Sequence, residues 1–303
     1  MSILKLIRWK NLVMIGMVQL LVKYAFLEPL GASVRLDTTG IIILILATMC
    51  IAAAGNIIND IYDVETDFVN KPNKLIVGKT ITEKAAYNWF LIFNIVGVGL
   101  GSYLSHVVNK SAFFSLFVIT SALLYMYATY LKQTVFFGNL VIAILVGLSV
   151  LIVGFFELIP SMNHLNRDTQ LAFFKVIFHY SLFAFAINLI REIVKDIEDF
   201  KGDSKASIQT FPVRFGIKKA THFVFILTLI LALIIVIYVN EILYKNIIAV
   251  LYFLIFIIGP LVYVAIKLLT TKTKKDLHQV SNLLKIIMLF GMLSLLLYKY
   301  ILI

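Results

Sequence analysis

The sequence predicts an all-α membrane protein, a multispanning bundle of about nine transmembrane helices with a cytoplasmic cap of loops. Only 14% of its 303 residues are charged and 61% are hydrophobic, whereas soluble domains carry about 25% charged residues. Nine apolar runs are long enough to cross a hydrocarbon core of ~30 Å, which takes about 20 residues. Since composition does not change along the chain, we expect a single transmembrane domain over residues 1–303.

Most of the apolar runs follow one another at short intervals, and the two long connections, residues 62–86 and 192–218, follow the second and sixth runs. Short connections between successive runs favour an up-down helical bundle. The predicted spans cover residues 11–31, 40–61, 87–106, 112–131, 137–158, 171–191, 219–240, 246–268 and 283–303.

Lys and Arg are distributed unequally between the two sides of the predicted bundle. The N-terminus and segments 62–86, 132–136, 192–218 and 269–282, with their borders, carry 19 of the 27 basic residues. By the positive-inside rule this side is cytoplasmic, as expected for a protein of the cell (inner) membrane surrounded by membrane lipids. The same rule accounts for the net charge of +11, and no motif predicts a nucleic-acid partner.

Two acidic motifs with the spacing D-x-x-D-x-x-x-D each follow an apolar run. At about 100° per residue, the three positions fall within about 60° of one another if the helix continues that far. We therefore expect each trio on one helix face where a span meets the cytoplasm. The carboxylates are Asp60, Asp63 and Asp67 in the first motif and Asp196, Asp199 and Asp203 in the second.

Six neighbouring carboxylates repel one another, which keeps some protonated unless a cation neutralises them. Mg²⁺ binds carboxylate oxygens and leaves positions open for phosphate. The motifs therefore predict a Mg²⁺–diphosphate site in which all six aspartates are metal ligands and catalytic residues. A solvated helix end is the alternative for each trio, and the repeated spacing at a membrane border argues against it.

Polar and basic residues beside the motifs are candidates for substrate binding. An amide oxygen of Asn56 or Asn59 could complete a metal shell or orient a substrate, although an interhelical hydrogen bond explains Asn56 equally well. Basic side chains could neutralise the part of an oligo-anion that the metal does not cover. For any single lysine, positive-inside charge is an equal explanation. The basic candidates are Lys71, Lys74, Lys79, Arg191 and Lys195.

A third cytoplasmic border contains Tyr127 and Lys132. On spacing alone these are an interface tyrosine and a snorkelling lysine. The five histidines show no ligand spacing for a transition metal. With Cys50 as its single cysteine, the chain has no disulfide framework.

The two motifs resemble the paired signatures of the UbiA superfamily of intramembrane prenyltransferases. Residues 59–67 are similar to its N-D-x-x-D-x-x-x-D signature, and residues 196–203 to its second one. Residues 71–78 resemble its basic, proline-containing loop. Residues 127–132 are similar to its tyrosine–lysine element, with a spacing one residue longer. The resemblance covers nearly the whole chain, including the number of spans.

This resemblance implies Mg²⁺-dependent transfer of a polyprenyl group from a polyprenyl diphosphate donor to a lipid or aromatic acceptor. Metal ions and nearby Lys or Arg side chains would stabilise the departing diphosphate. The acceptor would attack the allylic carbocation while the apolar bundle excludes water. It also makes Tyr127 and Lys132 substrate-binding residues.

The acceptor is predicted from residues 191–203, which look most like the geranylgeranylglyceryl phosphate geranylgeranyltransferases of archaeal-type lipid synthesis. Lys201, Lys205 and Arg214 in the following loop would suit a phosphorylated acceptor. An aromatic acceptor, as in quinone or menaquinone synthesis, stays open because no residue excludes it.

Two other kinds of membrane protein, a transporter and a phosphotransferase, also carry acidic residues near or within their spans. A cation-coupled transporter would carry its acids near the midplane, often on broken helices, whereas these acids follow the spans. A CDP-alcohol phosphotransferase would carry D-x-x-D-G-x-x-A-R and a second acidic group in one stretch, and this chain lacks that pattern. Only the prenyltransferase predicts Mg²⁺-dependent release of diphosphate from a prenyl diphosphate.

Overall fold

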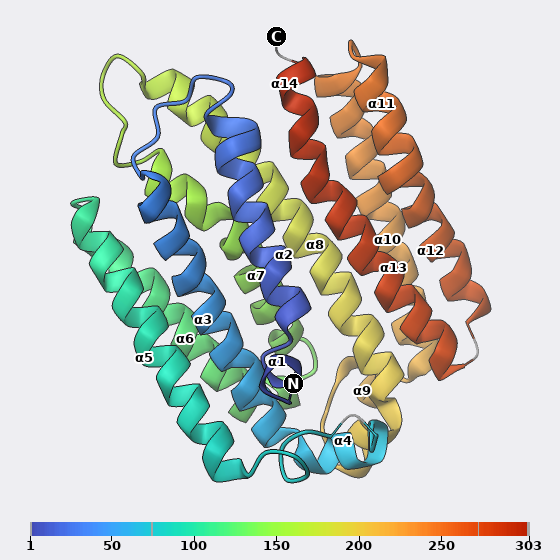
Figure 1. The fold of residues 1–303 in the computed structure, drawn as a ribbon. Helices are drawn as coiled ribbons and strands as arrows, with labels where there is room; N and C mark the ends of the chain where they lie inside the picture. Colours follow the sequence, from blue (N-terminus) through green and yellow to red (C-terminus); the bar gives the residue numbers. More distant parts are fainter. Residues whose placement is uncertain (1, 74, 272, 302–303) are drawn as a thin grey trace.

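The computed structural model describes residues 2–73, 75–271 and 273–301, and its secondary structure in these ranges is helical apart from one isolated bridge (Figure 1). Among the described residues, nine helices are long and apolar enough to cross a membrane, which confirms the predicted all-α bundle of nine spans. Several spans are continued by short 3₁₀ or π turns, labelled η. The elements are α1 (Ser2–Leu6), α2 (Trp9–Leu20), η1 (Leu21–Leu27), α3 (Thr38–Tyr62), α4 (Val64–Asn70), α5 (Glu83–Val107), η2 (Ser111–Phe113), α6 (Phe114–Thr129), η3 (Leu131–Gln133), α7 (Phe137–Glu157), α8 (Arg167–Lys205), α9 (Phe211–Phe215), α10 (Ile217–Tyr238), η4 (Val239–Leu243), α11 (Ile247–Phe253), η5 (Leu254–Ile258), α12 (Gly259–Thr270), α13 (Lys274–Leu293), η6 (Ser294–Leu297) and α14 (Tyr298–Ile301).

Helix α8 differs most from its predicted span. The apolar pattern ends at residue 191, but the helix continues to Lys205 and so carries the whole second acidic motif. Its polar last part is rich in Lys, Glu and Asp, and includes a Glu192–Lys195 pair three residues apart at 2.6 Å. Such pairs support a helix that hydropathy alone does not detect.

Side-chain caps fix where several spans begin. The Asp37 carboxylate accepts a hydrogen bond from the Gly40 backbone N–H at 2.7 Å at the start of α3. Thr82 accepts one from the Ala85 N–H at 3.3 Å at the start of α5. Each cap satisfies a backbone donor that has no partner within its own helix.

Helices α3 and α8 stand at the centre of the bundle. Helix α3 packs against α2, α5 and α6, whereas α8 packs against α7, α10 and α13. Figure 1 shows α1, α4 and α9 at one end, together with the N-terminus and the ends of α3 and α8 that carry the motifs. This agrees with the predicted placement of the N-terminus and both motifs on the same side.

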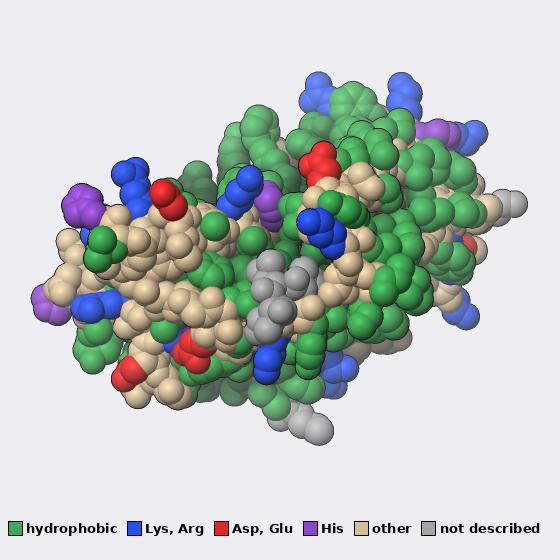
Figure 2. Space-filling model, turned by 90° about the horizontal axis from the view of Figure 1, so that it is seen from above, with side chains coloured by type: hydrophobic (Ala, Val, Ile, Leu, Met, Phe, Trp, Pro, Cys, Tyr) green, Lys and Arg blue, Asp and Glu red, His purple; other side chains and the backbone are tan. Residues whose placement is uncertain are grey.

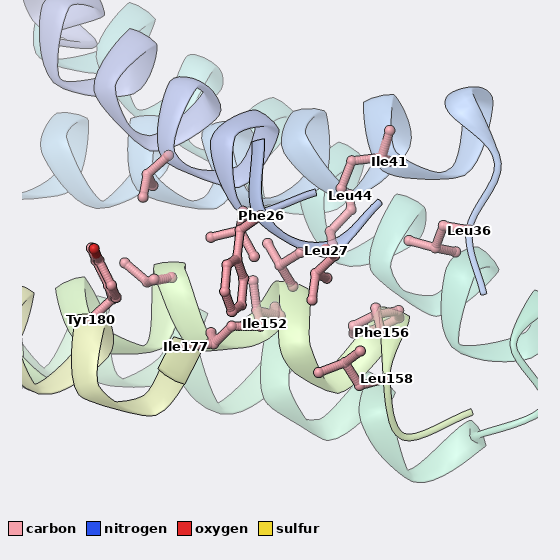
Figure 3. Packing of buried hydrophobic residues seen from close by; sticks show 14 of the residues in the cluster. Phe26, Leu27, Leu36, Ile41, Leu44, Ile152, Phe156, Leu158, Ile177 and Tyr180 are labelled. Atoms are coloured by element: carbon pink, nitrogen blue, oxygen red, sulfur yellow. The ribbon is translucent and has the colours of Figure 1, made fainter. Parts of the chain in front are cut away.

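The end of the bundle away from the motifs holds a tightly packed apolar cluster (Figure 3). Phe26, Leu44 and Phe156 are fully buried there. The Phe26 ring makes edge contacts with Tyr298 and Phe173, at centroid distances of 5.0 and 5.6 Å. The cluster therefore joins the first and last spans to α8 and fixes the bundle at this end.

The outer flanks of the bundle expose large apolar side chains. Ile95 on α5 is 71% exposed, Leu233 on α10 59% and Ile255 in η5 60%. Figure 2 views the bundle from the end away from the motifs and shows hydrophobic side chains around its flanks, with charged side chains scattered singly. An apolar outer surface over helices of membrane-spanning length is that of an integral membrane protein.

A buried ion pair joins three segments at the end away from the motifs. Lys23 (1% exposed) lies 2.8 Å from Glu157 (0% exposed) and also donates to the Leu36 carbonyl oxygen. The other Glu157 oxygen accepts from the backbone N–H groups of Arg35 and Leu36, at 3.0 and 2.9 Å. Both charges are thus satisfied by hydrogen bonds, which a buried pair requires.

Breaking this pair is expected to destabilise the bundle. Lys23→Met or Glu157→Leu alone leaves one uncompensated buried charge, which costs about 3–5 kcal/mol. The double variant removes both charges and should lose less than the two single variants together. Thermal unfolding in detergent measures this, and strictly additive losses would contradict the coupling.

Candidate active site

Helix α3 ends inside the first acidic motif. Asp63 has φ −92° and ψ 0°, and α4 begins at the next residue. Asp60 therefore lies in the last turn of α3, Asp63 at the junction and Asp67 on α4. The expectation of one continuous face is wrong for this motif, whereas the second motif does lie on one helix. The junction is held by the Asn59 side chain, which donates to Asp63 Oδ2 at 2.6 Å.

All six aspartates of the two motifs line one cavity of about 1020 Å³. Most of the other predicted residues line it too. Lys79 does not: it is exposed, on the turn that follows Val77. Lys74 lies outside the described residues. The predicted residues that line the cavity besides the aspartates are Asn56, Asn59, Lys71, Tyr127, Lys132, Arg191 and Lys195.

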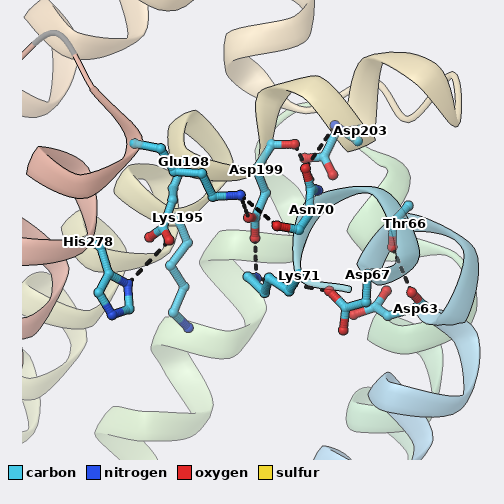
Figure 4. A network of polar contacts seen from close by, with 12 residues as sticks. Asp63, Thr66, Asp67, Asn70, Lys71, Lys195, Glu198, Asp199, Asp203 and His278 are labelled. Carbon is cyan, nitrogen blue, oxygen red and sulfur yellow. Dashed lines mark hydrogen bonds and ion pairs between the residues drawn. The ribbon is translucent and has the colours of Figure 1, made fainter. Parts of the chain in front are cut away.

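Lysine side chains connect the two motifs and their surroundings (Figure 4). Lys71, just after α4, lies 2.5 Å from Asp199 on α8 and 4.0 Å from Asp67. Lys132 in η3 forms an ion pair with Asp63. The cavity therefore pairs its carboxylates with cations from other segments and does not leave them to repel one another.

Charge pairing changes the pKa values around the cavity mouth. Burial alone would lower the pKa of Lys71, but the neighbouring charges of Asp199 and Asp67 outweigh it and raise the pKa. The pKa of Lys132 is raised in the same way, with Asp63 outweighing burial. Both lysines stay charged and can act as fixed positive groups.

The pKa of Asp67 is also raised, which disfavours the charged form of this carboxyl. Burial raises the pKa of its carboxyl, and the charges of Asp63 and Asp60 raise it further, while Lys71 and Lys132 oppose them. Burial is the largest cause and repulsion between neighbouring carboxylates adds to it; a bound cation would oppose both.

Helix α4 is clamped against α8 by Asn70. Its amide donates to the Asp199 carbonyl oxygen and accepts from the Gly202 N–H, both at 3.0 Å. A side chain at position 202 would collide with this amide, so glycine allows the close approach. Lys274 adds a bond to the Asn70 carbonyl oxygen at 3.0 Å. These contacts hold the first motif beside the second.

Two further residues complete the polar wall, and neither was among the predicted site residues. Arg8 reaches Asp60 at 2.6 Å from the left-handed conformation (φ 53°) that joins α1 to α2. Asn139 on α7 donates to Asp196 at 2.7 Å. Arg8 was counted as topology-determining charge, and Asn139 stands within an apolar span.

Asn56 makes a structural hydrogen bond, but to the turn between α1 and α2 and not to another helix. Its side chain donates to the Ile7 carbonyl oxygen at 3.0 Å and so ties the N-terminal segment to α3. The cations expected in a loop that faces the acceptor are on helices, Lys201 and Lys205 at the end of α8 and Arg214 on α9. All three are exposed and do not line the cavity.

The residues at the cavity fit a divalent cation. Asn59 Oδ1 and Asp199 Oδ1 are buried oxygens that accept no hydrogen bond in the described part of the chain, although the Lys274 ammonium lies 3.5 Å from Asp199 Oδ1. Buried acceptors without a hydrogen bond require explanation. Within the same ranges, no three His, Cys, Asp or Glu side chains lie together as a ready metal cluster. Mg²⁺ does not require one, because it binds through one or two carboxylates together with substrate phosphates and water.

Below the polar mouth the cavity is lined by apolar side chains. They come from α2, α3, α6 and α7, and therefore from the interior of the membrane-spanning bundle. A long apolar ligand chain can lie there with its charged head at the aspartates. Representative residues are Ile15, Ile51, Phe117, Leu124, Leu145 and Ile152.

The family of the chain follows from a match of residues 28–298 to the model of the UbiA prenyltransferase family. The chain belongs to this family. It is an integral membrane prenyltransferase, which confirms the resemblance of its acidic motifs and excludes the transporter and the CDP-alcohol phosphotransferase.

Individual UbiA family members add detail. The chain is 35% identical over 256 residues to a digeranylgeranylglyceryl phosphate synthase of Methanosphaera stadtmanae, covering 83% of this chain and 86% of that one. A solved structure described as digeranylgeranylglyceryl phosphate synthase in membranes has a TM-score of 0.65 at 25% identity, covering 98% and 97%. A UbiA homologue from Archaeoglobus fulgidus bound to GPP and Mg²⁺ shares the fold, with a TM-score of 0.59 at 14% identity, covering 97% and 99%.

Removing one charge from either motif is expected to abolish prenyl transfer without unfolding the protein. In Asp63→Asn and Asp199→Asn the side chain keeps its size but loses an anionic ligand. We expect turnover to fall by at least about 100-fold, the scale of losing a major electrostatic contribution. Diphosphate release and size-exclusion chromatography in detergent measure the two properties.

Asp168→Asn is the matched control, since this exposed residue lies at the opposite end of α8. It should retain activity. Normal turnover in both motif variants would rule out the site.

Proposed function

We propose that this UbiA family member transfers a geranylgeranyl group from geranylgeranyl diphosphate to geranylgeranylglyceryl phosphate. The observation that carries the proposal is the convergence of two acidic motifs at the mouth of one cavity with an apolar interior. The 35% identical Methanosphaera relative named digeranylgeranylglyceryl phosphate synthase supports this acceptor. We propose further that residues 1–303 form one catalytic domain.

The cofactor we propose is Mg²⁺, each ion held by one or two of the six aspartates, with the unpaired Oδ1 of Asn59 as a further ligand. When bound, Mg²⁺ supplies Lewis-acid stabilisation of charge on the diphosphate oxygens. Lys71 and Lys132 stand beside the same carboxylates and would add fixed positive charge to the leaving diphosphate. Tyr127 lines the cavity next to the motifs and contributes to substrate binding.

The apolar interior of the cavity would bind the prenyl chain of the donor. Each CH₂ group moved out of water contributes ~0.8 kcal/mol, so a long chain supplies much of the binding energy. The same walls exclude water, which would otherwise capture the allylic carbocation before the acceptor hydroxyl. In the step that forms this cation, the donor C–O bond breaks and diphosphate leaves with the electron pair. The acceptor hydroxyl oxygen then donates an electron pair to the carbocation, which forms the new C–O bond, and its proton passes to a base such as the departed diphosphate.

The orientation we propose places the N-terminus and the cavity mouth in the cytoplasm, in the inner membrane of the cell. The bias of Lys and Arg towards the connections on this side supports it. A soluble diphosphate product would then be released into the cytoplasm.

Prenyl transfer is tested by diphosphate release from geranylgeranyl diphosphate by the detergent-purified chain. Parallel reactions contain geranylgeranylglyceryl phosphate, dihydroxynaphthoate, 4-hydroxybenzoate or no acceptor. We expect Mg²⁺-dependent release stimulated by the glyceryl phosphate alone, together with a doubly prenylated product. Stimulation by an aromatic acceptor instead would replace the proposed acceptor with a quinone precursor.

The proposed orientation is tested by cysteine labelling in intact cells. Leu75→Cys in a Cys50→Ala background places one thiol in the connection between α4 and α5. A membrane-impermeant maleimide should react with it only after the membrane is opened. Labelling in sealed cells would reverse the topology.

A further inference from the structure

Two buried hydrogen-bond donors on α8 face the cavity without an acceptor. Asn188 is 4% exposed and its Nδ2 donates to no group in the described ranges. The same is true of the buried Nε of Arg191, three residues further along. Both residues line the cavity and, at this spacing, lie on the same side of α8. Such donors cost free energy unless a ligand accepts from them.

The wall around these two donors carries excess positive charge. Arg8, Lys10, Lys195 and Lys285 line the same cavity, and Arg191 interacts electrostatically with Arg8 and Lys285. Glu192 lies 3.3 Å from Arg191 and 2.6 Å from Lys195, so one carboxylate is shared by two cations.

Lys285 on α13 extends this wall. Its Nζ donates to Asn11 Oδ1 at 2.5 Å, which is a neutral partner. An ammonium group has three donors, so Lys285 can also donate to an anion in the cavity. Among the described residues, Lys285 forms no ion pair.

The two orphan donors lie deeper along the wall than the proposed metal site, although Arg8 joins the two regions through its ion pair with Asp60 at 2.6 Å. Measured from Asp196, the first aspartate of the second motif, Arg191 lies five residues back and Asn188 eight, which is about 7.5 and about 12 Å along the helix axis. The other cations that contact the motif carboxylates are Lys71, Lys132 and Lys274. The cavity thus has orphan acceptors at its mouth and orphan donors deeper along α8.

We propose that Asn188, Arg191 and Lys285 form a subsite for the phosphate group of the acceptor. This inference rests on the proposed function and refines it, since it assigns the two phosphorylated substrates to opposite ends of one polar wall. A phosphate monoester offers a double negative charge and several acceptor oxygens, which matches unpaired amide, guanidinium and ammonium donors.

The chemistry of a prenylated glyceryl phosphate fits this division. With one glycerol oxygen phosphorylated and another prenylated, the remaining hydroxyl lies only a few bonds from the phosphate. Holding the phosphate on the α8 wall would therefore keep this hydroxyl near the diphosphate end of the donor. The subsite would thus contribute both affinity for the acceptor and the position of its hydroxyl.

The test compares two acceptors, a prenylated glyceryl phosphate and the same prenylated glycerol without its phosphate, at saturating donor and Mg²⁺. The wild-type chain should prefer the phosphorylated acceptor. In Arg191→Gln and Asn188→Leu, its KM should rise by about 10- to 100-fold, the loss of one or two charge-assisted hydrogen bonds. The KM for the donor should stay within about twofold, and the preference for the phosphate should disappear.

Lys175→Gln is the matched control, because this lysine is on α8, exposed and outside the cavity lining. It should keep the wild-type preference. Should Arg191→Gln fail to fold by size-exclusion chromatography, Lys285→Gln and Arg191→Lys carry the same comparison.

Each outcome of this test decides between specific alternatives. Equal losses with both acceptors, or a raised KM for the donor, would overturn the phosphate subsite while leaving the proposed reaction intact. Failure of the wild-type chain to prenylate any glyceryl acceptor would instead overturn the proposed function, and this inference with it.

Discussion

Pairing of carboxylates with cations across the cavity is the interaction on which the rest of the site depends. Six aspartates cannot share one partly buried space as bare charges, because their repulsion would favour protonated forms. Lys71 reaches from the end of α4 to Asp199, and Lys132 reaches Asp63 from the turn before α7. The segments that carry these cations must therefore be positioned together before either motif can bind a ligand.

The rest of the bundle provides that positioning. Asn70 and the glycine at position 202 bring α4 against α8. At the other end of the bundle, the apolar cluster around Phe26 and the Lys23–Glu157 pair join the first, fifth and last spans. The cavity lies between these two fixed ends, so its apolar interior is enclosed while its mouth remains polar. This arrangement suits a substrate with a charged head and a long apolar chain.

Hydropathy and charge bias were sufficient to predict the nine spans and to place both motifs at one end. The membrane makes this possible, because a helix is the only structure that satisfies the backbone of such apolar runs. The break of α3 at Asp63 was not predictable, since the motif spacing is equally compatible with a continuous helix. It depends on the packing of α4 against α8, a contact between residues about 130 positions apart.

The roles of individual basic residues could not be predicted from the sequence either. Positive-inside charge explains any lysine on the cytoplasmic side equally well, so Lys79 and Lys132 could not be separated until Lys132 was seen beside Asp63. Arg8 and Asn188 were missed for the same reason: nothing local distinguishes a residue whose partner is distant in the chain. Orphan donors and acceptors, which only a three-dimensional structure reveals, gave the clearest evidence of where ligands bind.

The most direct measurement is an experimental structure of the chain with Mg²⁺ and geranylgeranyl thiodiphosphate, an unreactive donor analogue. The account predicts metal density between carboxylates of α3–α4 and those of α8, with the diphosphate beside Lys71 and Lys132. The prenyl chain should extend between α3, α6 and α7. Diphosphate density elsewhere, or metal bound by only one of the two motifs, would contradict a site shared between them.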